Sequence, residues 1–296
     1  MRFLFIFISF FFIVSIYLTE LYLKYVGLGD PVRYDSNYIY GYAPKENQRK
    51  ERFKGSKISI NELGLRTPNS WNNSQKDKII FIGDSITYGG SYIDDKEIFS
   101  HLVCLELKNY LCGNAGVNAY SIINMVMRSK YDKRINNSEV YIFTVAPGDF
   151  YREYVGSNTA HFYLNQKKFF LPAITEAISF IATRYDINNY ISKRNDTKNY
   201  NNKIELIDYS IKLLKSEIDR LLESGKKVRV FYTVEKYDKN SHKEINSYIL
   251  SQLLKANIKN FYSLEKVLSK DEYFYDSVHY NKKGHRVVAE KIISTF

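Results

Sequence analysis

The 296-residue chain predicts an α/β fold, a three-layer sandwich with a mostly parallel central sheet, preceded by an N-terminal transmembrane helix. Short apolar runs alternate with longer amphipathic segments from residue 78 to the C-terminus. That alternation is typical of parallel strands that are covered by helices on both faces. A single long apolar run at the N-terminus stands apart from this pattern and indicates a membrane span.

The N-terminal span is apolar over residues 3–18, and the residues up to Leu23 extend it to roughly 20. A cleavable signal peptide needs small residues in an A-x-A-like arrangement. Bulky side chains such as Tyr17 and Tyr22 occupy that zone instead. We therefore predict an uncleaved signal anchor over residues 1–24.

Charge at the two ends of the span predicts its orientation. Arg2 and the α-amino group lie before the span, and Lys24 lies after it. A larger basic cluster at residues 45–54 lies beyond the window of roughly 15–20 residues in which charge controls topology. The balance favours a single-pass membrane protein with its body on the non-cytoplasmic side, periplasmic or extracellular.

The rest of the chain divides into a lead-in and a main domain. Residues 25–75 are polar and turn-rich, and we interpret them as a stalk and lead-in segment. Within it, the alternation at residues 57–60 predicts a short strand, and Gly64 predicts a turn. The main domain is predicted to cover residues 76–296. An insertion at about 150–202, rich in Asn, Tyr and Lys, is interpreted as lying over the edge of the sheet as a candidate substrate lid.

The elements of the main domain follow from hydrophobic periodicity. Short continuous apolar runs that end at Gly or Pro predict buried strands, and apolar residues at helical spacing predict helices. The predicted strands cover residues 79–82, a segment that begins at Leu111, 140–145, 228–234 and 261–264. The predicted helices cover residues 96–109, 121–134, 204–222, 242–254 and 283–294.

Composition limits the classes of partner. Hydrophobic residues make up 45% of the chain and charged residues 25%, which is the profile of a globular protein. The net charge is +11, but the lysines are spread along the whole chain, so we interpret the charge as a solubility feature. The sequence has no motif of a nucleic-acid-binding fold, and nucleic acid is not an expected partner. The 27 Tyr and 19 Phe residues are assigned mainly to packing, with an aromatic sugar-binding cleft as the alternative.

Cys104 and Cys112 are the two cysteines of the chain. Neither has the spacing of a metal ligand with a second Cys or His pair, so no metal site is expected. They are either two buried thiols or, in an oxidising compartment, one disulfide.

A candidate nucleophile follows the first predicted strand, in the sequence Gly83-Asp84-Ser85. A serine there lies at the C-terminal end of a parallel strand, the edge at which open α/β sheets bind ligands. Gly83 permits the tight exit from the strand, and the next helix can present N–H groups to an anion. Turns use the same residue types, so the motif gains specificity only from partners elsewhere in the chain.

Asp276 and His279 are candidate partners near the C-terminus. A serine hydroxyl needs a base within hydrogen-bond reach, and the base needs a third group that holds its tautomer. Asp276 and His279 can supply both from one turn; the alternative is that they only cap the entry to the last helix. The remaining histidines have no Asp at this spacing: His101, His161, His242 and His285.

Taken in order, these motifs resemble those of the SGNH (GDSL-like) hydrolases. The sequence GDSITYGG at residues 83–90 resembles the first block of that family, residues 114–120 the second and residues 276–284 the last. The segment at residues 60–66 resembles a lead-in of its membrane-anchored envelope members. The likeness covers about residues 76–296.

The resemblance implies a fold, roles and an activity. The fold is a flavodoxin-like α/β sandwich, and the activity is carboxylic ester hydrolysis without metal or organic cofactor. Ser85 would be the nucleophile, His279 the general base and Asp276 its orienting partner. The backbone N–H groups of Ser85 and Gly116 would stabilise the oxyanion.

One block departs from the family pattern. The third block has the form G-x-N-D, and its Asn donates to the oxyanion, but Gly148 stands at that position in Ala146-Pro147-Gly148-Asp149. Either the oxyanion hole has two donors, or another group supplies the third, with Asn114 and Asn118, which flank Gly116, as the nearest candidates in the sequence. Asn118 is two residues further on and in extended chain points to the same face, so we predict that Asn118 completes the oxyanion hole; its alternative is an ordinary turn residue.

Three functions are weighed on this basis. The first is hydrolysis of O-acyl groups, chiefly O-acetyl, on a cell-envelope glycan through an acyl-enzyme. The second is O-acyl transfer to such a glycan by the same triad, with a sugar hydroxyl attacking in place of water. The third is a non-catalytic glycan-binding protein, suggested by Gly148, against which the complete set of triad residues argues. The expected partners are an acylated glycan or another acyl ester and, through the N-terminal helix, the membrane.

Overall fold

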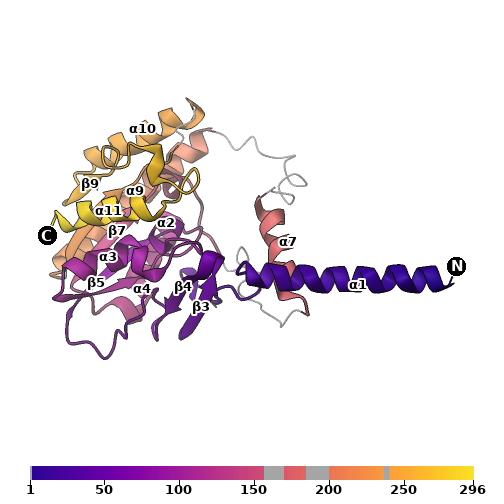
Figure 1. Ribbon diagram of the computed structural model, residues 1–296. Helices are drawn as coiled ribbons and strands as arrows, with labels where there is room; N and C mark the ends of the chain where they lie inside the picture. Colours follow the sequence, from indigo (N-terminus) through magenta and orange to yellow (C-terminus); the bar gives the residue numbers. More distant parts are fainter. Residues whose placement is uncertain (1, 157–169, 185–199, 237–239) are drawn as a thin grey trace.

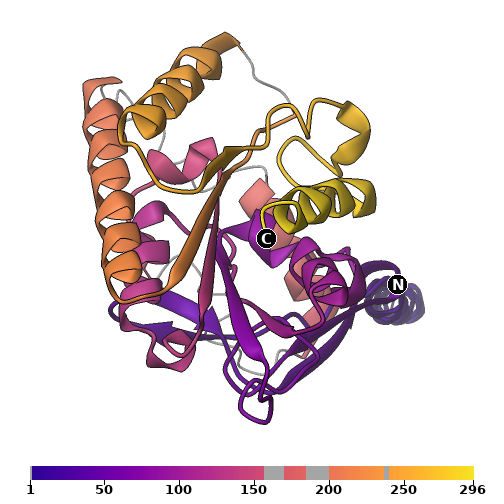
Figure 2. The same ribbon diagram turned by 90° about the vertical axis from the view of Figure 1, so that its left-hand side faces the viewer.

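Five parallel strands form the central sheet of the body (Figures 1 and 2). The computed structural model describes residues 2–156, 170–184, 200–236 and 240–296. The strands are β5 (Asp77–Gly83), β6 (Tyr110–Asn114), β7 (Val140–Val145), β8 (Lys227–Tyr232) and β9 (Phe261–Ser263), in the spatial order β6-β5-β7-β8-β9. This order is that of flavodoxin-like doubly wound sheets. The predicted α/β fold with a parallel sheet is confirmed.

Burial on both faces explains why β5 reads as an unbroken apolar run. β5 lies between two strands, with Ile79 opposite Cys112 of β6 and Val140 of β7. Helices cover both faces of the sheet, so every side chain from Ile79 to Ile82 is fully buried. A strand in such a position needs apolar residues at both parities.

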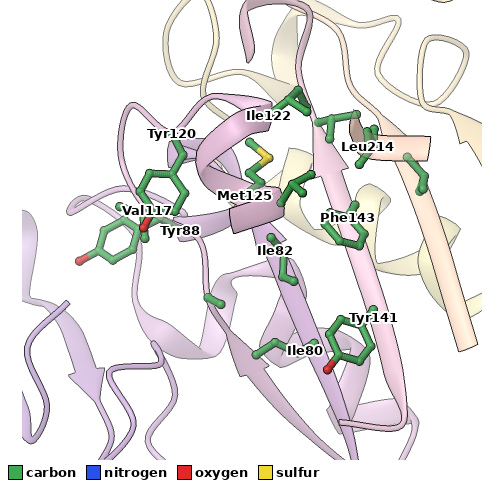
Figure 3. Packing of buried hydrophobic residues seen from close by; sticks show 14 of the residues in the cluster. Ile80, Ile82, Tyr88, Val117, Tyr120, Ile122, Met125, Tyr141, Phe143 and Leu214 are labelled. Atoms are coloured by element: carbon green, nitrogen blue, oxygen red, sulfur yellow. The ribbon is translucent and has the colours of Figure 1, made fainter. Parts of the chain in front are cut away.

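Helices on the two faces form two separate cores. One face packs against α4 (Ile122–Tyr131), α9 (Tyr200–Glu223) and α10 (Asn240–Lys255), and the other against α3 (Phe99–Glu106) and α11 (Lys282–Ile293). In Figure 3, Ile80, Ile82 and Phe143 lie among Met125 and Leu214 on the first face. The three layers of helix, sheet and helix match the predicted sandwich.

The segment before β5 is part of the body. It forms two antiparallel hairpins, β1 (Tyr34–Asn37) with β2 (Gly41–Pro44) and β3 (Gln48–Arg52) with β4 (Ser56–Ile60). Its side chains in the same core as α4 and α9 are Val32, Tyr34, Tyr42, Ile58, Ile60, Leu65 and Trp71. The stalk and lead-in segment at residues 25–75 stays a prediction as a domain division, and residues 34–71 of it pack on the body. The tyrosines made this segment look polar, although their rings fill the core.

The N-terminal helix projects away from the body (Figure 1). α1 (Arg2–Tyr25) is long and apolar enough to cross a membrane, by length and composition. α7 (Pro172–Arg184) crosses it close to the body, and Glu20 of α1 accepts hydrogen bonds from the N–H groups of Ala173 and Ile174 at 3.1 and 2.9 Å. α7 belongs to the predicted insertion, whose residues 157–169 and 185–199 lie outside the described residues.

Cys104 of α3 and Cys112 of β6 form a disulfide. This bond decides between the two alternatives left by the sequence. The remaining elements are short: α2 (Ser85–Tyr88), α5 (Pro147–Phe150), and the 3-10 turns η1 (Phe53–Gly55), η2 (Asp95–Glu97), η3 (Lys133–Ile135) and η6 (Asp271–Tyr273).

Candidate active site

Ser85 lies at the turn from β5 into α2, at the carboxyl edge of the sheet. The strand exit is so close-packed that a Cβ on Gly83 would lie 2.0 Å from Thr87 Oγ1 and 2.6 Å from the Thr144 carbonyl. Asp84 caps α2, because its Oδ1 accepts a hydrogen bond from Ile86 N–H at 2.8 Å. Ser85 is therefore held at the first position of the helix, where its N–H has no intrahelical acceptor.

Asp276 and His279 lie on the loop between η6 and α11. Oδ1 of Asp276 accepts the backbone N–H groups of Val278 and His279 at 2.9 and 2.8 Å, and Tyr275 N–H donates to the His279 carbonyl at 2.8 Å. The Asp276 carboxylate thus stabilises the turn that positions His279. Nδ1 of His279 lies 2.8 Å from Asp276 Oδ2.

The structure brings the three predicted triad residues together. Nε2 of His279 lies 2.9 Å from Oγ of Ser85, although the two residues are 194 positions apart in the sequence. With Nδ1–H donated to Asp276, Nε2 carries the free lone pair that faces the serine hydroxyl. This is a hydrogen-bonded chain of carboxylate, imidazole and hydroxyl, the arrangement that activates a serine.

The interaction between Asp276 and His279 favours the charged form of each residue. Burial by itself raises the pKa of Asp276, but hydrogen bonds from the His279 ring and from the backbone N–H groups outweigh it and hold that pKa well below its usual range. Burial also lowers the pKa of His279, but the hydrogen bond to Asp276 and its negative charge outweigh this effect, so the pKa is raised. Asp276 is therefore ionised and stabilises the imidazolium form of His279.

A second acidic pair includes Asp84, the residue before the nucleophile. The carboxyl groups of Asp84 and Asp149 hydrogen-bond each other, and burial raises the pKa of both, that of Asp149 well above its usual range. Two carboxyl groups in contact share a proton, since both cannot remain ionised. Asp149 is fixed by Ala146 N–H at 2.8 Å and by Arg152 Nη1 at 3.3 Å.

The predicted oxyanion donors have different surroundings. The N–H of Gly116 donates to Asn114 Oδ1 at 2.8 Å and is buried, so this predicted donor is already engaged. The glycine is required for packing, because a Cβ there would lie 2.3 Å from Tyr88 N. Asn118 and Ala119 are exposed beside it, and Ala119 has a left-handed φ of 64°. The role of Asn118 stays a prediction.

A cavity of about 300 Å³ adjoins the triad. Two of its lining residues, Asp84 and Val278, are sequence neighbours of Ser85 and His279. The full lining is Asp84, Ala146, Gly148, Asp149, Tyr151, Arg152, Glu235 and Val278. Sequence reasoning missed Tyr151, Arg152 and Glu235, because no motif marks them and only the fold brings the ends of β7 and β8 together.

A larger hollow of about 410 Å³ lies at the disulfide. It is lined by Tyr110, Leu111 and Cys112 at the start of β6, and therefore lies at the opposite edge of the sheet from Ser85. Within the described residues, no group of three or more His, Cys, Asp or Glu side chains could hold a metal ion.

No family model and no curated protein matches the sequence. Among solved structures, the chain is similar to a lipolytic protein of the G-D-S-L family from Desulfitobacterium hafniense, with 13% identity, 75% of this chain and 100% of that chain covered, and a TM-score of 0.46. It is also similar to a catalytic mutant of the acetylxylan esterase Axe2 from Geobacillus stearothermophilus, with 14% identity, coverages of 74% and 93%, and a TM-score of 0.47. A third is the acetyl xylan esterase AlAXEase, with 23% identity, coverages of 74% and 98%, and a TM-score of 0.45. At these identities the likenesses concern the fold, and the function depends on the site described above.

Proposed function

We propose that the protein is a serine ester hydrolase of the SGNH type that removes O-acyl groups, chiefly O-acetyl, from a cell-envelope glycan. The observation that carries this proposal is the hydrogen-bonded chain of Ser85, His279 and Asp276 at the carboxyl edge of the sheet. The envelope glycan follows from the resemblance of the sequence motifs. The polar lining of the adjoining cavity, with carboxyl, phenol and guanidinium groups, suits a hydroxyl-rich substrate.

The reaction runs in two halves. Oγ of Ser85 attacks the ester carbonyl carbon while His279 Nε2 takes its proton, and Asp276 stabilises the imidazolium. The tetrahedral intermediate collapses when His279 gives that proton to the leaving sugar oxygen, which yields the acyl-enzyme and a free sugar hydroxyl. Water then attacks the acyl-enzyme, His279 takes the proton of the water, and the carboxylic acid leaves as Ser85 regains its hydrogen.

The negative charge on the carbonyl oxygen needs preorganised donors. The N–H of Ser85 is the first such donor. Because Gly116 N–H is bonded to Asn114, we propose that the exposed residues Asn118 and Ala119 present the donors of the second loop in its place. Asn118→Ala should then lower kcat more than it raises KM, and an unchanged kcat would remove its side chain from the mechanism.

The disulfide supports the proposed location. Disulfides persist in oxidising compartments and are rare in the cytosol. The bond between Cys104 and Cys112, together with α1, favours a body that is anchored on the non-cytoplasmic side of the membrane.

The test uses the full-length protein purified in detergent and incubated with acetylated envelope glycan, with released acetate measured. The wild type should release acetate and react with a fluorophosphonate probe, and Ser85→Ala should do neither while keeping its fold. Acetate release that survives in Ser85→Ala would overturn the proposal.

Two further outcomes of the same experiment separate the alternative functions. If acetyl appears on an added deacetylated glycan and not as free acetate, the protein is an O-acyltransferase. If the glycan binds but stays intact in both variants, the protein is a binding protein.

A further inference from the structure

The position that lacks the third-block amide is not empty space. A Cβ built on Gly148 would have Arg152 Nη2 at 3.7 Å, Tyr151 OH at 3.8 Å and Glu235 Oε1 at 3.9 Å as its nearest neighbours. An asparagine amide nitrogen would lie two bonds beyond that Cβ. The edge of the Arg152 guanidinium therefore lies within reach of the place that the amide would occupy.

The second terminal nitrogen of Arg152, Nη1, holds the side chain at this place. Nη1 donates to the Tyr120 carbonyl at 2.6 Å and to Asp149 Oδ1 at 3.3 Å. Tyr120 follows the loop after β6 and Asp149 follows β7, so the side chain bridges two of the loops that surround Ser85. Nη2 has no acceptor among the described residues, and the guanidinium lines the cavity beside the triad.

We propose, resting on the esterase function above, that Arg152 is a catalytic residue whose Nη2–H stabilises the oxyanion in place of the missing amide. A charged donor binds a developing oxyanion more strongly than a neutral amide does. Arg is always protonated, so the donor is available at any working pH. The ion pair of Arg152 Nη1 with the buried Asp149 carboxyl at 3.3 Å keeps the guanidinium in this position.

The test is a rescue experiment on the full-length enzyme with a small aryl acetate. Arg152→Ala should lower kcat roughly 10²- to 10³-fold, the usual effect of one lost oxyanion donor, with little change in KM. Adding Gly148→Asn to Arg152→Ala should recover at least about tenfold of kcat, because the amide then returns to a place that the guanidinium has vacated.

The matched control is Arg220→Ala. Arg220 forms an i,i+3 pair with Glu217 as Arg152 does with Asp149, and the two side chains are 40% and 37% exposed. Arg220→Ala should keep the wild-type kcat. A wild-type kcat in Arg152→Ala, or a folded double variant without recovery, would overturn the role of Arg152 while leaving the esterase intact; a wild type without Ser85-dependent activity would overturn both.

A second, independent observation concerns α7. It crosses α1 near the body in Figure 1, and Figure 2 shows α1 end-on. Its inner side is fixed by Glu176, which is paired with buried Arg52 and accepts Gly29 N–H at 2.6 Å. Its outer side exposes large apolar side chains: Phe170, at 96%, just before the helix, and Ile178 and Ile181, one turn apart, at 62% and 51%.

The contact with α1 determines at which depth in the membrane the apolar side of α7 would lie. α7 meets α1 at Glu20, between the exposed rings of Tyr17, Tyr22 and Tyr25. Tyrosines are enriched where a membrane helix leaves the hydrocarbon. α7 thus lies crosswise at the level of the headgroups, the position of an interfacial helix.

We infer that α7 rests on the membrane surface with Phe170, Ile178 and Ile181 in contact with lipid. This is a second contact beside the span, and it holds the body close to the bilayer. It rests on α1 as a membrane anchor and is independent of the esterase chemistry.

Tryptophan quenching tests this inference in full-length protein reconstituted into vesicles of phosphatidylcholine with brominated acyl chains. The natural Trp71 is fully buried in the body. Ile178→Trp should add emission that is strongly quenched, whereas Leu254→Trp on α10, at a position also 62% exposed, should add emission that is not. Phe11→Trp reports on the anchor itself.

Quenched Phe11→Trp with unquenched Ile178→Trp would overturn the inference about α7 alone. A blue-shifted but unquenched Ile178→Trp would also overturn it, since the surface would then be covered by protein. Absence of quenching in both variants would overturn the anchor together with it.

Discussion

At the scale of the residue, two histidines six positions apart have opposite roles. His279 faces Ser85, and its pKa is raised. His285 is buried at the start of α11, where its Nδ1 accepts the Phe99 N–H at 3.2 Å, and burial above all lowers its pKa to about 3. The sequence separates the two, because only His279 follows an aspartate by three residues. Their environments, which set the ionisation, depend on packing that no motif encodes.

The pH dependence of hydrolysis follows from His279. The protonated ring cannot accept the Ser85 proton, so kcat/KM should rise with pH as His279 loses its proton. Because the pKa of His279 is raised, the midpoint should lie above the ordinary histidine value of about 6.5. A pH profile from about 5 to 9 measures this midpoint, and one below the ordinary value would contradict the assignment.

Substitutions at the two histidines should separate chemistry from stability. His279→Ala should lower kcat by about 10²- to 10⁴-fold with little change in the free energy of unfolding. His285→Ala should keep kcat but destabilise the fold by roughly 1–3 kcal/mol, because the buried Phe99 N–H loses its acceptor. Steady-state kinetics and urea unfolding of both variants make the comparison, and the reverse pattern would show that the last block is misread.

At the scale of the element, hydrophobic periodicity predicted strands that are buried in the core. It missed helix ends and hairpins that depend on individual side chains. The strand at 140–145 is found with its predicted bounds, because every residue in it is buried. The helix predicted at 96–109 is shorter, since η2 and α3 divide it: Asp94 caps Lys96 N–H, and α3 begins at Phe99. The strand predicted at residues 57–60 of the lead-in is found as β4. Its partner β3 and the hairpin of β1 and β2 escaped prediction, the latter because buried tyrosines do not stand out as apolar.

Arg66 shows how the lead-in is fixed to the site. Its side chain is fully buried and bonds Asp95 Oδ1 at 2.9 Å and the carbonyls of Tyr88, Gly90 and Ile93 at 2.8, 2.7 and 2.6 Å. Arg66→Ala should cost about 3–5 kcal/mol, because a buried carboxylate is left unpaired. Lys215→Ala, at the partly exposed i,i+4 pair with Asp219, should cost about 0–1 kcal/mol. Chemical unfolding measures both, and equal losses would contradict the anchoring role.

The disulfide closes a short loop between α3 and β6. Its cysteines are eight positions apart, and a loop of this size predicts about 2–3 kcal/mol of stabilisation from chain entropy. Reduction, or replacement of both cysteines by serine, should lower the melting temperature without changing kcat, because the bond lies at the opposite edge of the sheet from Ser85. Calorimetry with and without reductant checks this, and a parallel loss of kcat would show coupling to the site.

At the scale of the whole molecule, the chain consists of a projecting helix and a body on which residues 34–71 pack. The boundary of the catalytic domain at 76 stays a prediction, although packing of residues 34–71 into the same core favours an earlier start. Sequence reasoning separated the N-terminal apolar helix from the body because the run of residues 3–18 needs no tertiary information. It could not find the α1–α7 contact, which depends on a buried carboxylate 153 positions from its partner.

The anchor makes a prediction about fractionation. Full-length protein should stay in the membrane fraction after a high-salt wash, since an apolar span of this length is not released by screening charges. Protease added from outside should digest the body and spare α1. A mature N-terminus near residues 20–30 by Edman sequencing would contradict the anchor, and a protected body would contradict the orientation.

The distance along the chain between Ser85 and His279 determines when the triad can assemble during synthesis of the protein. The nucleophile lies in the first third of the chain, but the base arrives only with the last loop, before α11 docks on α3. A nascent chain that emerges N-terminus first therefore holds an unactivated serine until almost the whole body has been delivered. In the proposed esterase, assembly of the triad therefore coincides with completion of the chain, and a chain that stalls or loses its C-terminal segment should be inert from the start.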